Sequence, residues 1–391
     1  MKIIGIEPIL CDGGFRVWTF VKISTDEGIV GYGDCTCWES VPSIVEAIKF
    51  LSYQLIGEDP KNIERLYWKM ISRTRGSWGG IAHKAISGLD SALWDIKGKL
   101  AGVPVYDLLG GQCRDKLRLY WSHCGSIRYR RPDLFGKSVD SFEDIFKIGE
   151  EVVRSEFTAL KTNIFDPRIT PDEKVRPSVN QTMDKKDILL AVKVVKTFRE
   201  AVGEDVDICL DIGNRADVPS AIRLARDLEP FNLMFLEEPL LMGNPEACLT
   251  VKNSTKTPIC MSEGLYGTNG FRRFLELQAI DIAMPDFAWN GVSMGKKIAN
   301  LCETYYIPIA PHNCFSPLTT LISGHISASI NNFLILEFDV DDVPWRDKVI
   351  SKPLKVDKGY LRLSSEPGYG VELDEDEIKR HPPSHMLLYR Q

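Results

Sequence analysis

The chain has 391 residues and a formal net charge of −6 at pH 7. Its length exceeds that of a typical single domain, so we expect one large domain beside a smaller one. The charges are spread without acidic or basic blocks, which argues against nucleic acid and anionic membranes as partners. No apolar run reaches about 18 residues and the first residues show no export pattern, so the sequence predicts a cytoplasmic protein.

The ten cysteines form no Cys-x-x-Cys array. Most lie in strand-like or apolar helical runs, as Cys209, Cys260 and Cys302 do, and Cys35 and Cys37 are the only close pair. We therefore predict reduced cysteines in the core, and neither a disulfide framework nor a thiolate metal site.

The first part of the chain predicts a mixed domain. Residues 1 to about 35 alternate like strands and contain a turn at Asp26-Glu27-Gly28. From about 41 to 101, apolar residues recur at the three- and four-residue spacing of helices, and the last helix ends at Gly102. Strands followed by segregated helices indicate an α+β domain, which we assign to residues 1–115.

Eight strand-like runs follow, the first two at 117–123 and 157–163. Each of the other six ends in an acidic residue or a histidine, at intervals of 26, 26, 23, 26 and 25 residues. These residues are Asp211, Glu237, Glu263, Asp286, His312 and Glu337. The interval is the length of one strand-loop-helix-loop unit, so we predict a TIM-like β/α barrel over residues 116–340, with the six side chains at its C-terminal mouth. Capping of the next helix is the alternative for any one of them, but capping does not explain the order of residue types.

Two segments lie outside this repeat. After Glu337 the sequence returns to strand-like, turn-rich stretches, and we expect residues 341–391 to pack back on the N-terminal domain. Between the second barrel strand and the next helix, residues 166–185 form a long connection rich in Pro, Asp, Arg and Lys. A connection of that length is usually functional, so we predict a lid over the mouth that brings Arg168 or Arg176 to the substrate; a decorative insertion is the alternative.

The order of residue types suggests the chemistry. Asp211, Glu237 and Glu263 offer hard oxygen ligands and three negative charges, which suit Mg²⁺. Asp286 is placed to hold one nitrogen of His312 and so make the other nitrogen a base. Lys161 is expected to act either as a second acid-base group or as a cation for a substrate carboxylate. Glu337, if protonated in a crowded acidic site, would donate a hydrogen bond to an enediolate.

Five segments resemble the enolase superfamily, mandelate racemase subgroup, and the resemblance covers essentially the whole chain. They are residues 80–111, Leu236-Glu237-Glu238-Pro239, Ser262-Glu263-Gly264, Pro285-Asp286 and Pro311-His312-Asn313. The resemblance implies an α/β fold: a modified (β/α)7β TIM-like barrel with an α+β capping domain built from the N-terminal region and the C-terminal segment.

The resemblance also implies roles for residues. Asp211, Glu237 and Glu263 would bind one Mg²⁺ per subunit, while Glu238 points elsewhere. His312 with Asp286 would be the base, and Glu337 the electrophilic partner of the substrate carboxylate. Family habit further suggests a homo-oligomer, from dimer to octamer.

Two departures from the family pattern bear on the reaction. The second barrel strand ends Lys161-Thr162-Asn163 where racemases have Lys-x-Lys, and an amide cannot accept a proton at neutral pH. Gly213 stands where some dehydratases of the subgroup have a histidine acid. One base suffices for β-elimination of water, so we predict a dehydratase; the acid for the leaving hydroxyl would be His312 itself, Lys161 or His123.

The sequence predicts a dehydratase acting on an aldonate or aldarate and forming a 2-keto-3-deoxy acid. Arginines near the mouth, including Arg128 and Arg130, suit a polyhydroxy acid, and a second carboxylate would pair well with one of them. The predicted substrate-binding residues are Arg16, Trp18, His123, Asn163, Asn214 and Arg215. Both Trp18 and Trp38 have packing of the small domain as an alternative. A racemase or epimerase of a 2-hydroxy acid using Lys161 and His312, or a non-catalytic binding relative, are the alternative functions.

Overall fold

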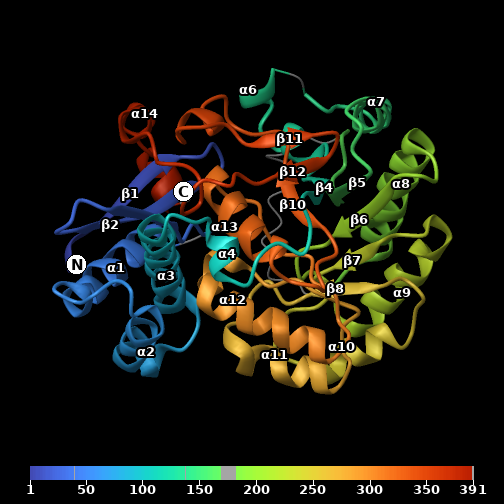
Figure 1. Ribbon diagram of the computed structural model, residues 1–391. Coiled ribbons are helices and arrows are strands. Elements are labelled where there is room, and N and C mark those ends of the chain that lie inside the picture. The colour runs from blue at the N-terminus through green and yellow to red at the C-terminus, as the bar shows by residue number, and fades with distance from the viewer. Residues whose placement is uncertain (39, 137, 169–181, 390–391) are drawn as a thin grey trace.

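A computed structural model describes residues 1–38, 40–136, 138–168 and 182–389 (Figure 1). Most of the predicted lid, including Arg176, lies outside these residues, and the lid remains a prediction. Within the described part of the chain, no helix is both long enough and apolar enough to cross a membrane.

The N-terminal region forms the expected meander followed by helices. Three antiparallel strands lie in the order β1 (Ile3–Asp12), β2 (Val17–Thr25) and β3 (Val30–Asp34). Three helices follow, α1 (Val41–Leu55), α2 (Ile63–Thr74) and α3 (Gly80–Ala101), the last ended by Gly102 at a φ of 70°. Helix α3 packs directly on β3, because a Cβ placed on Gly33 would lie 2.0 Å from the carbonyl oxygen of Gly88.

The barrel is closed. Parallel strands run in the order β4 (Leu117–Ser122), β5 (Ala159–Asn163), β6 (Asp207–Asp211), β7 (Phe235–Glu237), β8 (Ile259–Met261) and β9 (Ile282–Ala283), and β10 (Leu336–Asp339) pairs with β4. Between β9 and β10, the predicted seventh strand forms only isolated bridges among the described residues: Ala283 to Ile309, Asp286 to His312, and Ile309 to Phe333. Pro308 and Pro311 flank Ile309 and lack the N–H that a longer ladder requires.

Long helices cover the outside of the barrel, and short helices lie in the chain just before and after β4 (Figure 1). The outer helices are α7 (Phe142–Arg154), α8 (Lys185–Val202), α9 (Val218–Leu228), α10 (Pro245–Lys252), α11 (Gly267–Glu276), α12 (Phe287–Thr304) and α13 (Pro317–Ala328). The short ones are α4 (Val105–Leu108), α5 (Ser126–Arg130) and α6 (Pro132–Phe135). A small apolar cluster fills the barrel, with side chains such as Phe235, Cys209 and Cys260. All ten cysteines are free and all but Cys113 are buried, as predicted.

The C-terminal segment contacts both parts of the molecule. The hairpin of β11 (Lys355–Asp357) and β12 (Tyr360–Arg362) pairs with β4, so it extends the barrel sheet. Beyond it, Tyr369 donates its backbone N–H to Asp95 of α3 at 3.0 Å, and α14 (Glu375–Arg380) lies against β1, with α15 (His385–Tyr389) after it (Figure 1). The predicted packing on the N-terminal domain therefore holds for the last part only. The division into 1–115, 116–340 and 341–391 stays a proposal.

A polar seam fixes the capping helices on the barrel. In α12, the Ser293 hydroxyl donates to Asp90 of α3 at 2.5 Å, and its backbone N–H donates to the other oxygen at 2.8 Å. Gly291, at a φ of 74°, allows this approach, since a Cβ there would lie 2.7 Å from the Asp90 carboxylate. Trp289 also donates to the carbonyl of Thr36 at 2.8 Å. The loop after β3 is thereby held beside the barrel mouth.

Candidate active site

Three carboxylates gather at the ends of β6, β7 and β8. Asp211 and Glu237 are in register on adjacent strands, and Glu263 follows β8 by two residues. Glu237 is 1% exposed, and its Oε2 atom has no hydrogen-bond partner among the described residues. A buried carboxylate oxygen without a partner is costly, so this atom requires a ligand that the protein itself does not supply.

Neighbouring groups orient these carboxylates. The Asn163 amide donates to Oδ2 of Asp211 and the Gly213 backbone donates to Oδ1, both at 2.7 Å. Glu238 accepts the backbone N–H groups of Ser262 at 2.6 Å and Glu263 at 3.0 Å, so it shapes the turn that carries Glu263. Both Glu238 and Ser262 have positive φ angles, 43° and 110°, a backbone region that residues with a side chain rarely occupy.

The electrostatics of this cluster favour a cation. Burial raises the pKa of Glu237 well above its ordinary value, and although Lys161 opposes the shift, Asp211, Glu337 and Glu263 add to it. Repulsion among like charges of this kind is relieved by a divalent ion bound between them. The three oxygen donors and the unpartnered Oε2 atom therefore fit a hard cation such as Mg²⁺.

His312 and Asp286 form a dyad. The two side chains approach to 2.6 Å between Nδ1 and Oδ2, and the other oxygen of Asp286 accepts the backbone N–H of Trp289 at 2.9 Å. Asp286 therefore caps α12 and also contacts the imidazole of His312. Helix capping and placement beside His312, the two interpretations of this residue from the sequence, both apply to it. Burial disfavours a charged ring, but Cys314, Glu263 and Asp286 outweigh burial and raise the pKa of His312.

The other imidazole nitrogen, Nε2, faces the metal-ligand cluster. It lies 3.5 Å from Glu263 and 3.2 Å from the thiol of Cys314. Cys314 was not predicted as a site residue. Its position two residues after His312, beyond the end of the same barrel run, was the available signal.

Lys161 of β5 lies between Glu237 of β7 and Glu337 of β10. Lys161 is 2% exposed, and its Nζ lies 2.5 Å from Glu237 and 2.8 Å from Glu337. Burial lowers the pKa of Lys161, but these two carboxylates outweigh burial and raise it well above its usual range. Two roles were expected for Lys161, a second acid-base group or a cation for a substrate carboxylate. These ion pairs support the cation.

Glu337 is surrounded by hydrogen-bond donors and a cation, in contrast to the expectation that crowding would make it a protonated donor. It accepts hydrogen bonds from the Ser122 hydroxyl at 2.5 Å and from the Asn313 backbone at 2.7 Å. Burial raises the pKa of Glu337, but Lys161, His312 and His123 outweigh burial and hold it below the ordinary value. In this arrangement the Glu337 carboxylate accepts hydrogen bonds and donates none.

Two predicted substrate residues meet at Asp339, which follows Glu337 by two positions on β10. Asp339 lies 2.7 Å from Nδ1 of His123 and 3.3 Å from Nη2 of Arg16. Arg16 comes from the turn between β1 and β2, so this contact joins the capping sheet to the last barrel strand. Trp38 lies here too, with its ring centroid 6.3 Å from that of His123.

The remaining predicted substrate residues lie elsewhere or have another partner. Trp18 is wholly buried in the core, its ring next to Gly13 and Phe20, so its expected substrate contact is wrong and Trp38 lies at the mouth instead. With its amide nitrogen turned to donate, Asn214 bonds to the Leu240 carbonyl at 2.8 Å and to Glu238 at 3.0 Å. Asn163 likewise binds Asp211. Both amides support the carboxylate cluster.

Three of the predicted arginines have different surroundings. Arg128 forms ion pairs with Glu151 and Asp341 in a partly buried network, so it is structural. Arg215 is exposed at the mouth, in the loop after Asp211. Arg168, at the start of the predicted lid, forms an ion pair with Asp166 at 2.8 Å.

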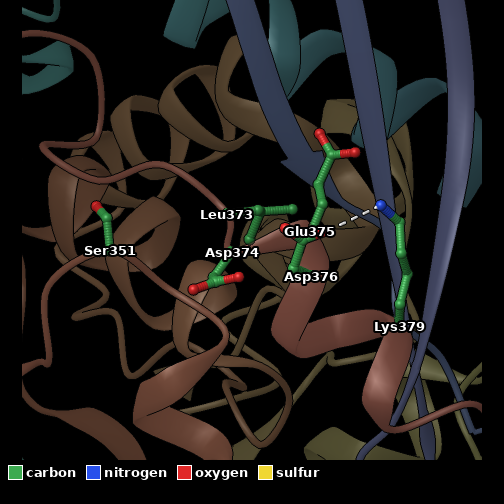
Figure 2. A pocket seen from close by; sticks show the side chains of 6 residues that line it. All are labelled: Ser351, Leu373, Asp374, Glu375, Asp376 and Lys379. Atoms are coloured by element: carbon green, nitrogen blue, oxygen red, sulfur yellow. Dashed lines mark hydrogen bonds and ion pairs between the residues drawn. The ribbon is translucent and has the colours of Figure 1, made fainter.

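The hollow in Figure 2 contains no predicted site residue. It is lined by Ser351 and by residues of the C-terminal segment, among them Asp374, Glu375 and Asp376. Lysines compensate this acidic group, since Lys379 donates to Asp376 at 3.1 Å and Lys22 pairs with Glu375 at 2.7 Å. We interpret it as a surface where the C-terminal segment is attached.

Comparisons with known proteins agree with this geometry. Residues 147–377 match the family described as enolase C-terminal domain-like, and residues 16–110 match the N-terminal domain of mandelate racemase and muconate lactonizing enzyme. D-xylonate dehydratase of Haloferax volcanii is 33% identical over 99% of this chain and 90% of its own. D-galactonate dehydratase of Xanthomonas oryzae pv. oryzae is 31% identical over 94% of this chain and 92% of its own.

Solved structures are similar over almost the whole chain. A provisionally assigned L-alanine-DL-glutamate epimerase of Burkholderia xenovorans strain LB400, bound to magnesium and fumarate, has a TM-score of 0.94 and 32% identity. The match covers 99% of this chain and 98% of that one. A mandelate racemase/muconate lactonizing enzyme-like protein from Rubrobacter xylanophilus has a TM-score of 0.88 and 35% identity, with 98% of each chain covered.

Proposed function

The chain belongs to the mandelate racemase and muconate lactonizing enzyme family of enolase-like proteins, and we propose that it is a Mg²⁺-dependent acid-sugar dehydratase. The substrate class is an aldonate or aldarate and the product a 2-keto-3-deoxy acid. Full-length relatives named as D-xylonate and D-galactonate dehydratases support this class.

The single observation that supports elimination over racemisation is the residue that occupies the position of the second base. Asn163 stands there, and its side chain is bonded on both sides, to Asp211 at 2.7 Å and to the Ser126 hydroxyl at 2.8 Å. Lys161, which matches the first lysine of the Lys-x-Lys pattern, is a buried cation between two carboxylates. Only His312 remains as a base, and one base is sufficient for elimination but not for inversion through two faces.

Asp211, Glu237 and Glu263 would hold the cation, one per subunit. When bound, Mg²⁺ supplies the Lewis-acid charge that lowers the pKa of the proton α to the substrate carboxylate. Lys161 presents a fixed positive charge beside the same carboxylate group. Glu237 and Glu337 keep that charge in place, since each lies within 3 Å of the ammonium group.

His312 would then carry out both proton steps. Its Nε2 takes the α-proton as the C–H bond breaks, while Asp286 holds Nδ1 and stabilises the imidazolium. The bond from the β-carbon to its hydroxyl breaks next, and Nε2 returns the proton to that hydroxyl, which leaves as water. The enol that results becomes the 2-keto acid. We favour His312 over Lys161 and His123 as the acid because His123 is bound to Asp339 and Lys161 to two carboxylates.

A screen for 2-keto acids tests this proposal. The enzyme is incubated with Mg²⁺ and a library of aldonates and aldarates, and semicarbazide detects the keto product. We expect product from at least one acid sugar, and none from the His312→Asn variant. An epimer without keto acid would support the racemase alternative, and binding without any product would support a non-catalytic relative. The homo-oligomer and the cytoplasmic location remain predictions for solution and cell measurements.

A further inference from the structure

Arg16 is an unusually enclosed arginine beside the proposed base. It is 2% exposed, and its guanidinium carbon lies 3.7 Å from the ring centre of Phe15, 4.5 Å from Trp38 and 5.4 Å from Phe315. Phe315 in turn packs against His312, with ring centres 5.4 Å apart. Aromatic faces hold the guanidinium by cation–π attraction and leave its edge for hydrogen bonds.

That edge is largely unused. Arg16 has one side-chain hydrogen bond in the structure, from Nη2 to Asp339 at 3.3 Å. Its Nε and Nη1 atoms are buried and have no partner among the described residues. Buried donors of a charged group are expected to be satisfied, since leaving them unpaired costs more than an ordinary missing hydrogen bond. These atoms are therefore expected to donate to a ligand.

The charge around Arg16 indicates what kind of ligand. Asp339 offsets one positive charge and is shared with His123. Arg130 follows β4 and Arg215 follows Asp211 of β6, and both are exposed, so neither belongs to the enclosure around Arg16. The two donors of the buried Arg16 guanidinium that have no partner in the described part of the chain suit an anion.

The location sets which end of a substrate would reach it. Asp339 lies on β10, which closes the barrel against β4, whereas the carboxylate cluster lies on β6, β7 and β8. A substrate whose first carboxylate lies at that cluster, with its α-carbon below His312, would extend its other end toward Arg16.

We propose that the substrate carries a second anionic group at this far end, a carboxylate or a phosphate, and that Arg16 is its hydrogen-bond donor. The inference rests on the proposed dehydratase function and deepens it from acid sugars in general to those with two anionic ends. It makes Arg16 a specificity-determining residue, whereas aldonates, with a hydroxyl at the far end, would offer its unpartnered donors no negative charge.

Matched substrates test the inference. The value of kcat/KM is measured with Mg²⁺ for an aldonate, for the aldarate of the same configuration and for the aldonate phosphorylated at its last carbon. We expect one of the two-anion acids to exceed the aldonate by about 100-fold, the worth of two hydrogen bonds to a charged group. The phosphate and carboxylate forms identify the source of the anion. An aldonate turned over as well as or better than both would overturn the proposal.

Variants locate the effect. Arg16→Gln should reduce the selectivity for the two-anion acid over the aldonate by about 100-fold. Arg118→Gln, which removes an arginine at the opposite end of β4 that pairs with Asp207, should leave the selectivity unchanged. Equal selectivity in the Arg16→Gln and wild-type enzymes would contradict the assignment.

A binding measurement keeps the test independent of turnover and of the folding of Arg16→Gln. Titration of His312→Asn with the three acids in the presence of Mg²⁺ should give the same order of affinity. If two-anion acids bind tighter but no keto acid forms in wild type, the dehydratase proposal fails while the Arg16 site stands. If keto acid forms but the aldonate binds best, the Arg16 inference fails alone.

Discussion

The two sides of the barrel mouth leave different buried atoms without a partner. On the negative side, three carboxylates stand at the ends of β6, β7 and β8, and one buried oxygen of Glu237 has no partner among the described residues. On the other side, at β10, the buried Arg16 has two donors without a partner among the described residues. His312 stands between them, 3.5 Å from Glu263 and in ring contact with Phe315. We propose a cation for the first side and an anion for the second, because the described residues complete neither set of atoms.

The largest expected effect concerns the residue between the two sides. His312→Asn should lower kcat by about 1,000-fold because it removes the group that moves both protons, while the ligand sets on either side stay intact. Calorimetric titration should still show Mg²⁺ binding. Asp286→Asn should be milder, because it alters the orientation of the imidazole and keeps the base. A His312→Asn enzyme with a tenth of wild-type activity would exclude His312 as the base.

The negative side is tested by its metal affinity. Glu263→Gln should weaken Mg²⁺ binding by more than about 100-fold, the upper effect of losing a supporting group, because it removes a proposed ligand itself. The measurement is the shift in melting temperature with Mg²⁺ concentration. Glu276→Gln, a change on the outer helix α11, is the matched control and should bind Mg²⁺ as wild type does. Unchanged affinity in Glu263→Gln would remove it from the ligand set.

A variant of Asn163 tests how Asp211, one of the three carboxylates, is oriented. Its amide holds Asp211 at 2.7 Å, so Asn163→Ala should weaken Mg²⁺ binding by about 10- to 100-fold, as loss of groups that orient metal ligands typically does. If Asn163 instead contacts only substrate, Mg²⁺ affinity would stay constant and KM alone would rise. Asn331→Ala, at an exposed site, provides the control.

A smaller effect concerns the pH dependence of folding stability, through His325 of α13. Burial lowers the pKa of His325 to about 3, and its Nδ1 accepts the Tyr106 backbone N–H at 3.1 Å. The unfolded chain binds a proton near pH 6.5 and the folded one does not, so stability is full above pH 6.5 and falls by about 1.4 kcal/mol per pH unit below it. His325→Gln should flatten that slope in denaturant unfolding at pH 4 to 7. An equal slope in both proteins would mean that His325 titrates normally.

The strand-end positions of the carboxylates were predictable from their spacing and the partner of Arg16 was not, for a physical reason. Asp211, Glu237 and Glu263 lie at successive strand ends, so their spacing alone places them together. Arg16 meets Asp339 across 323 residues of sequence, and no periodicity relates them. The sequence predicted Arg16 and Trp18 as substrate-binding residues, but Trp18 faces the core and Trp38 faces Arg16.

Protonation states depended on contacts of the same long-range kind. Acidic crowding suggested a protonated Glu337, but Lys161, two strands away on β5, forms an ion pair with it at 2.8 Å. Asn163 and Asn214 were correctly located near the mouth, yet their partners proved to be carboxylates of the protein. Spacing along the chain fixes which strand end a residue occupies, whereas the partner of its side chain depends on the closed barrel.

The central claim is that one base acts from one face of the substrate. Incubation of the enzyme with Mg²⁺ and a substrate acid sugar in D₂O tests it, with NMR of both the product and the recovered substrate. We predict 2-keto-3-deoxy acid as the product, and recovered substrate without the inverted epimer at the α-carbon. An inverted, deuterated epimer that forms faster than the keto acid would contradict the account and establish a second base on the face where Asn163 and Lys161 lie.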